Sequence, residues 1–137
     1  MREILFRGKR VDNGEWVEGY YVNSIGPDCE PNETRHYIVT YPGDWHEVCP
    51  STVGQYTGLT DEKETRIFEG DVIKVKWGDG YQYRVVIFEN GLFEARSKPD
   101  TYGGFYSVSL VSFAGFNNPE LHCEVVGNVF DNADLLK

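Results

Sequence analysis

The alternation of apolar and polar residues is clearest between residues 71 and 96. Residues 71–77 place apolar side chains on one side and two lysines on the other, which is the two-residue period of a strand with one face in a core. Gly78-Asp79-Gly80 is interpreted as a hairpin loop, and residues 81–89 continue the alternation. We therefore predict that six side chains are buried on one core face: Ile73, Val75, Trp77, Tyr83, Val85 and Ile87.

Turn dipeptides divide the rest of the chain into short strands. Asn90-Gly91 joins the second strand to residues 92–96, so three strands form a meander. Asn13-Gly14 predicts another hairpin near the N-terminus. Further strands are expected over residues 36–41, 105–113 and 124–130, and no long segment has the 3.6-residue period of a helix.

Many short strands separated by turns predict an all-β fold. We expect a small SH3-like or related barrel formed mainly by residues 66–137. An additional N-terminal β subdomain, residues 1–60, would pack on it or form a second sheet. The length of 137 residues fits one domain, and the charged stretch 60–66 is the best boundary between the two subdomains.

Charge disfavours general binding to nucleic acid, because the net charge is −9 and an acidic chain repels phosphate groups. The N-terminus is locally basic, and its candidate binding residues are Arg7, Lys9 and Arg10. These cations are also typical of an edge strand protected by charge from aggregation. Glu69 and Asp71 flank Gly70 and are a second candidate binding pair, or the polar turn that begins a strand.

Neither a catalytic set nor a metal site is predicted, and no cofactor is expected. Asp44, His46 and Cys49 are ligand types that zinc accepts, but the paired spacing of structural zinc sites is missing. Cys29, Cys49 and Cys123 form an odd, irregular set, which favours free thiols in a reducing compartment.

Six residues of the meander are of the types that form a stacking surface for single-stranded nucleic acid. Alternation argues against such a surface, because it places the aromatic residues on the core face and the cations on the solvent face. The six residues are Lys74, Lys76, Trp77, Tyr81, Tyr83 and Arg84.

Three stretches, in this order and spacing, resemble the YopX family of small phage and prophage proteins. They are residues 2–8 (REILFRG), residues 52–59 with 67–72 (TVGQYTGL and IFEGDV), and residues 124–132 (EVVGNVFDN). The chain departs from the family pattern at residues 61–65 and 132–136. The resemblance implies a mainly β fold, a phage or prophage origin and a bacterial cytoplasmic setting, and it carries over no functional residues.

The sequence therefore predicts a cytoplasmic, non-enzymatic binding or accessory module that acts on a host or phage protein. The alternative is engagement of nucleic acid, or mimicry of DNA, in phage replication or regulation. No membrane span is expected, because no apolar run approaches the required length of ~20 residues. Residues 3–7 are apolar on both faces, which predicts a homo-oligomer formed through strand edges or an apolar patch near the N-terminus.

Overall fold

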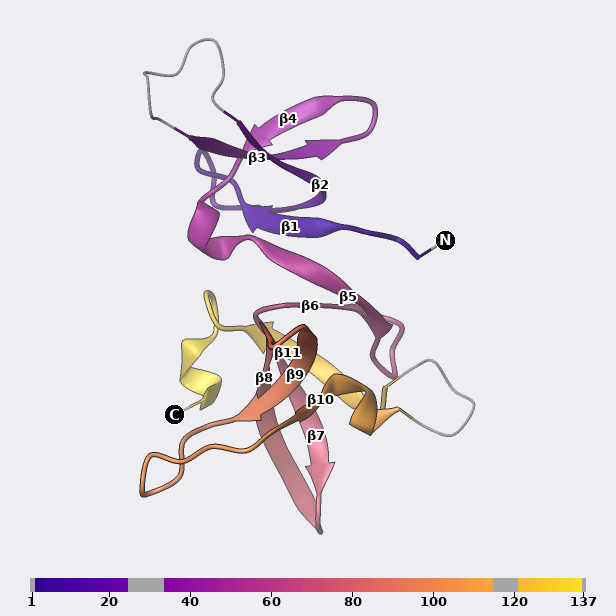
Figure 1. Ribbon diagram of the computed structural model, residues 1–137, viewed down its shortest axis with the longest axis vertical. Coiled ribbons are helices and arrows are strands. Elements are labelled where there is room, and N and C mark those ends of the chain that lie inside the picture. Colours follow the sequence, from indigo (N-terminus) through magenta and orange to yellow (C-terminus); the bar gives the residue numbers. More distant parts are fainter. Residues whose placement is uncertain (1, 25–33, 115–120, 137) are drawn as a thin grey trace. The chain divides into compact units, whose positions relative to one another are not determined.

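The computed structural model describes residues 2–24, 34–114 and 121–136 (Figure 1). The chain divides into two compact units, Met1–Tyr56 and Thr57–Lys137. The described residues form antiparallel sheets and short 3₁₀ helices, so the predicted all-β class is confirmed. No helix among them is both long and apolar enough to cross a membrane. Cys29 lies outside the described residues.

The first unit is a sheet in which one long strand pairs with two different neighbours. Residues 16–19 of the second strand pair with the first strand, and residues 20–24 pair with the third. The expected hairpin at Asn13-Gly14 joins the first two strands. The elements are β1 (Phe6–Lys9), β2 (Trp16–Ser24), β3 (Arg35–Thr40), β4 (Asp44–Glu47), η1 (Pro50–Thr52) and the start of β5 (Gly54–Thr60). With β6 (Arg66–Phe68), the sheet order is β4-β3-β2-β1-β5-β6.

Gly19 lies where β2 changes partners, and the backbones there approach closely. A Cβ atom at Gly19 would lie 2.3 Å from the Val39 carbonyl oxygen and 3.1 Å from Cγ2 of Ile38. Ile38 is fully buried and forms the centre of this unit's core with Val48. Only glycine fits here without moving the backbone of β3.

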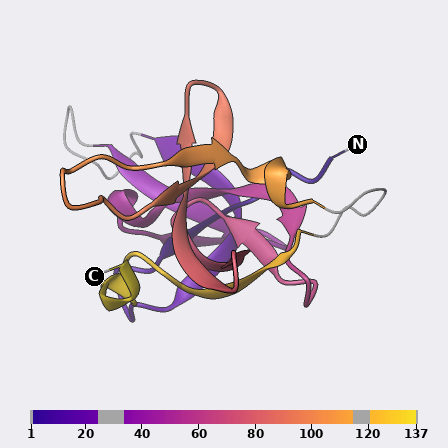
Figure 2. The same ribbon diagram turned by 90° about the horizontal axis from the view of Figure 1, so that it is seen from below.

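The second unit contains the predicted meander. Its elements are the end of β5, β6, β7 (Asp71–Trp77), β8 (Gly80–Glu89), β9 (Leu92–Ser97), β10 (Ser107–Ser109), η2 (Leu110–Phe113), β11 (Cys123–Asn128) and η3 (Ala133–Leu136), a short helix near the C-terminus in Figure 2. The structure confirms the meander as β7-β8-β9, within a five-stranded sheet of the order β10-β9-β8-β7-β11.

Within the described residues, neither sheet closes into the expected barrel. The edge strands β10 and β11 stay at opposite sides of the sheet. The strand expected over residues 105–113 is correct only for Ser107–Ser109, because the chain turns into η2 and buries Leu110. The SH3-like likeness stays a prediction.

The core of the second unit corrects the predicted face of β8. Ile73 and Val75 are fully buried as expected, and Val85 and Ile87 are half-buried. Trp77 and Tyr83, however, are 58% and 39% exposed, and that part of the prediction is wrong. The buried cluster is Ile67, Ile73, Val75, Val86, Ala95, Leu110, Leu121 and Cys123.

The cause of the error at Tyr83 is the length of one turn. The hairpin between β7 and β8 has two residues, Gly78 and Asp79, so that Trp77 pairs with Gly80 rather than with Tyr81. Shifting the register by one residue moves every side chain to the other face of the strand. Consequently Arg84 and Val86, rather than Tyr83 and Val85, face the core.

A buried carboxylate links the hairpin between β5 and β6 to β11. Asp61 is 1% exposed, and its oxygens accept hydrogen bonds from the backbone N–H groups of Lys63, Thr65 and Val125, each at 2.9 Å. Burial, together with the charges of Asp61 and Glu62, raises the pKa of the neighbouring Cys123 thiol to about 12. The thiol therefore stays protonated and unreactive in the folded protein.

Gly19→Ala should lower the free energy of unfolding by about 1–3 kcal/mol, because the new Cβ atom forces the backbones of β2 and β3 apart. Gly80→Ala is the matched control: its Cβ atom would meet no atom within 4 Å, and its backbone is not in the left-handed region. That control should change stability by less than about 0.5 kcal/mol. Urea unfolding measures both, and equal losses would contradict the close approach at Gly19.

Cys123 should make stability fall at alkaline pH. The ordinary thiol pKa of 9.0, restored on unfolding, lies below the folded value of about 12, so the unfolded chain loses this proton first as pH rises. Relative to Cys123→Ala, the wild type should therefore lose roughly 1 kcal/mol of unfolding free energy between pH 7 and about pH 10. Urea unfolding of both proteins under reducing conditions measures this, and a pH-independent difference would refute the raised pKa.

Candidate functional site

The outer side of the β7–β8 hairpin carries tyrosines and lysines together. Lys74 pairs with Tyr83 and Lys76 pairs with Tyr81, so these four side chains lie on the side of the sheet opposite to Ile73 and Val75. With Lys98, which follows β9, we call this surface the tyrosine–lysine face.

The two tyrosine rings of this face are accessible. Tyr81 is 70% exposed and Tyr83 is 39% exposed. The Lys74 Nζ atom lies 4.3 Å from the centre of the Tyr81 ring, a cation–π contact that holds this ammonium group beside the ring. Both tyrosines and Lys98 line a hollow of about 420 Å³, together with Leu135 and Leu136 of η3.

A buried arginine supports the hairpin from its inner side. Arg84 is fully buried, its Nε donates to Oε1 of Gln82 at 2.9 Å, and its Nη1 donates to the Ala95 carbonyl at 3.1 Å. Its guanidinium lies 5.1 Å from the centre of the Trp77 ring, and burial lowers its pKa. Trp77 therefore covers this cation, and its expected role as a core residue is replaced by that contact.

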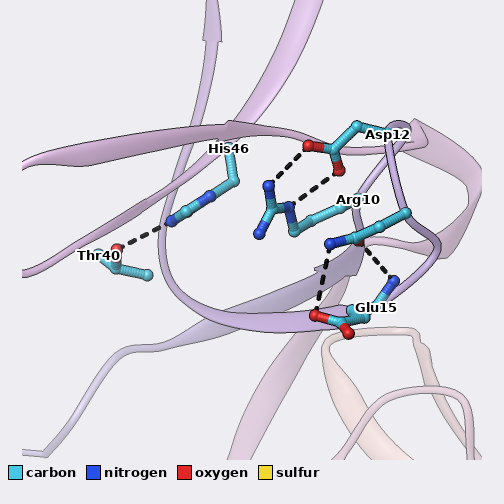
Figure 3. Close-up of polar contacts among 6 residues, drawn as sticks. Arg10, Asp12, Glu15, Thr40 and His46 are labelled. Atoms are coloured by element: carbon cyan, nitrogen blue, oxygen red, sulfur yellow. Dashed lines mark hydrogen bonds and ion pairs between the residues drawn. The ribbon is translucent and has the colours of Figure 1, made fainter.

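The structure separates the three basic residues predicted at the N-terminus. Arg7 and Lys9 lie on one face of β1, at 4.7 and 5.8 Å from the centre of the Trp16 ring. Arg10 instead forms a bidentate ion pair with Asp12, with bonds of 3.0 and 2.6 Å (Figure 3). This pair raises the pKa of Arg10 and lowers that of Asp12. Only Arg7 and Lys9 are thus brought together.

Glu69 and Asp71 lie at the turn between β6 and β7, where Gly70 has a φ of +91°. Asp71 is 1% exposed, and its Oδ2 accepts a hydrogen bond from the Phe68 N–H at 2.8 Å. Glu69 is half-buried. The Asp71 carboxylate therefore stabilises the turn, and a binding role for this pair stays a prediction.

The side chains considered for zinc make other contacts. His46 Nε2 is hydrogen-bonded to the Thr40 hydroxyl at 3.1 Å (Figure 3), and the Cys49 thiol lies 3.3 Å from the Ser51 hydroxyl. Over the ranges that the structure describes, no three His, Cys, Asp or Glu side chains gather in a way that would hold a metal ion. Cys123, next to His122, is a buried thiol with a raised pKa, which is the opposite of an activated nucleophile.

The N-terminal segment expected to form an oligomer interface is partly exposed. Ile4 is 47% exposed and lines a shallow hollow with Arg2, Glu3 and Tyr20, whereas Leu5 and Phe6 are half-buried. Self-association through this segment stays a prediction.

The prediction that Tyr83 lies in the core excluded the stacking surface, and the tyrosine–lysine face contains four of the six residues considered for it. One signal could have identified it: a two-residue loop at Gly78-Asp79, which is the commonest length for a hairpin, places Tyr81 and Tyr83 on the lysine side of β7. The length of the loop therefore determines which face of β8 packs on the core, and the apolar pattern of β8 alone does not.

Comparison with known proteins bears on the family and the fold. No curated protein matches the chain significantly. The crystal structure of protein EF1440 from Enterococcus faecalis is similar over 100% of both chains, with a TM-score of 0.56 and 17% sequence identity, a likeness that supports the fold alone. The family model described as YopX protein matches residues 5–137, nearly the whole chain, which confirms the resemblance found in the sequence. The chain belongs to the YopX family.

Proposed function

We propose that the protein is a non-enzymatic binding module that acts on another macromolecule, of a phage or of its bacterial host, through the tyrosine–lysine face. The observation that carries the proposal is the exposure of Tyr81 and Tyr83 beside Lys74 and Lys76 on one side of a paired hairpin. Tyrosine is enriched among the residues that dominate binding energy, because its rigid ring gives a large contact area at low entropic cost.

The support beneath the face favours a preformed binding surface. Both tyrosines pair with lysines of β7, Tyr81 with Lys76 and Tyr83 with Lys74, and from Arg84 onward the same strand also pairs with β9. Arg84, on the inner side of the same strand, is held by Gln82 and Ala95. A binding surface on paired strands loses less conformational entropy on binding than one on a loop.

The cellular setting of this function comes from the family. The phage or prophage origin, the bacterial cytoplasm and a host or phage protein as ligand are what the resemblance and the sequence suggested, and they are part of the proposal. The tyrosine–lysine face suits a protein ligand as well as a nucleic acid.

An affinity capture with two double variants tests the proposal. The immobilised wild type, Tyr81→Ser/Tyr83→Ser and the control Tyr41→Ser/Tyr102→Ser are each incubated with lysate of bacteria that carry a related prophage. The control removes two tyrosines that are 96% exposed but lie outside the face. Retained proteins are identified by mass spectrometry and retained nucleic acids by staining.

We expect a species that the wild type and the control retain and the Tyr81/Tyr83 variant loses. Unfolding curves establish that the three proteins are equally folded, which is expected because exposed side chains contribute little to stability. Retention of the same species by all three proteins, or of none by any of them, would overturn the proposal.

A further inference from the structure

The two tyrosines of the tyrosine–lysine face have the spacing of a stacking platform. Tyr81 and Tyr83 are two residues apart on one strand, so their Cα atoms lie about 7 Å apart along it and their rings leave the sheet on the same side. Aromatic side chains exposed in this way stack with nucleobases that are not already stacked and paired. Such bases are available in single strands and not inside a duplex.

Cations flank both rings. Lys74 lies across from Tyr83 and contacts the ring of Tyr81, Lys76 lies across from Tyr81, and Lys98 lines the hollow beside Tyr83. Among the described residues, none of these three ammonium groups forms an ion pair. A phosphate backbone passing along the rings would therefore meet positive charge on both sides of the strand.

The charge of this region differs in sign from that of the whole chain. Residues 71–98 contain five Lys or Arg and four Asp or Glu residues, a net charge of +1, whereas the whole chain carries −9. Three of the four carboxylates are occupied: Asp71 is buried at its turn, Glu89 pairs with Arg96, and Glu94 accepts a hydrogen bond from Ser107. The fourth, Asp79, is in the hairpin loop, so Lys74, Lys76 and Lys98 outnumber the remaining carboxylate of this region.

The hollow beside the two tyrosine rings could accommodate a nucleobase. Leu135 and Leu136 contribute apolar side chains to the lining of this hollow of about 420 Å³, together with Tyr81, Tyr83 and Lys98. Asp134 also lines this hollow, so the phosphate would be held at Lys98 and at the hairpin rather than at η3. An acidic peptide would use the lysines, but its carboxylates do not stack on the two rings as nucleobases do.

We infer that the tyrosine–lysine face binds single-stranded nucleic acid, with bases stacked on Tyr81 and Tyr83 and phosphates at Lys74, Lys76 and Lys98. This inference rests on the proposed binding function and names its ligand. Because phosphate contacts release counterions, this binding weakens as salt rises, and at low salt the negative charge of the rest of the chain repels long polyanions that contact a larger surface.

Fluorescence anisotropy with a labelled 20-residue oligothymidylate tests the inference. The wild type and Tyr41→Ser/Tyr102→Ser should bind it with equal affinity, and Tyr81→Ser/Tyr83→Ser should bind it at least about tenfold more weakly because stacking is lost. For three phosphate contacts, the slope of log K against log salt should be about −2, and Lys74→Gln/Lys76→Gln should make it smaller in magnitude.

Two outcomes would overturn the inference. One is absence of binding by the folded wild type at low salt; if a protein is nevertheless captured through Tyr81 and Tyr83, the binding function stands and only the nucleic-acid ligand is wrong. The other is binding that the tyrosine variant retains fully and that heparin, which has no bases, displaces as well as unlabelled oligonucleotide does. That result would mean general attraction of polyanions without stacking.

Discussion

The two-residue turn at Gly78 and Asp79 is the constraint on which the second unit depends. Ile73 and Val75 must face the core, and the pairing of Trp77 with Gly80 then determines which side chains of β8 accompany them. Arg84 and Val86 therefore face the core, and Tyr81 and Tyr83 face the outer side of the sheet. A turn one residue longer would exchange these sets, because the side chains of a strand alternate strictly between its faces.

Burying Arg84 is costly, and the structure offsets the cost locally. Its guanidinium donates to a glutamine and a backbone carbonyl and is covered by Trp77, so a cation removed from water keeps polar partners. The same register that buries this cation leaves two other cations, Lys74 and Lys76, beside accessible rings. Core packing and candidate binding surface are therefore two consequences of one register, and the proposed function depends on it.

The meander and its hairpins could be predicted, because turn dipeptides report local backbone geometry and the lysines of β7 leave only one apolar face. The face of β8 could not be predicted from its pattern, since Tyr83 and Val85 on one side compete with Val86 and Phe88 on the other. The burial of Asp61, in the charged stretch 60–66 expected to separate two subdomains, could likewise not be predicted, because the amide of Val125, 64 residues away, holds this carboxylate in the interior. The separation of Arg10 from Arg7 and Lys9 follows from strand alternation and from Asp12, a partner supplied by the next turn. Turns and strands, which depend on residues close in sequence, could therefore be predicted, whereas pairing between distant residues could not.

Thiol labelling at two positions of β8 tests the register most directly. Tyr83→Cys and Val86→Cys are treated with a maleimide in the folded state, and peptide mass spectrometry locates the label, which distinguishes it from reaction at the natural cysteines. The exposed position 83 should react rapidly, whereas position 86, where Val86 is fully buried, should react only when the protein unfolds. Rapid labelling at position 86 of a folded variant, with protection at position 83, would contradict the register and remove the tyrosine–lysine face.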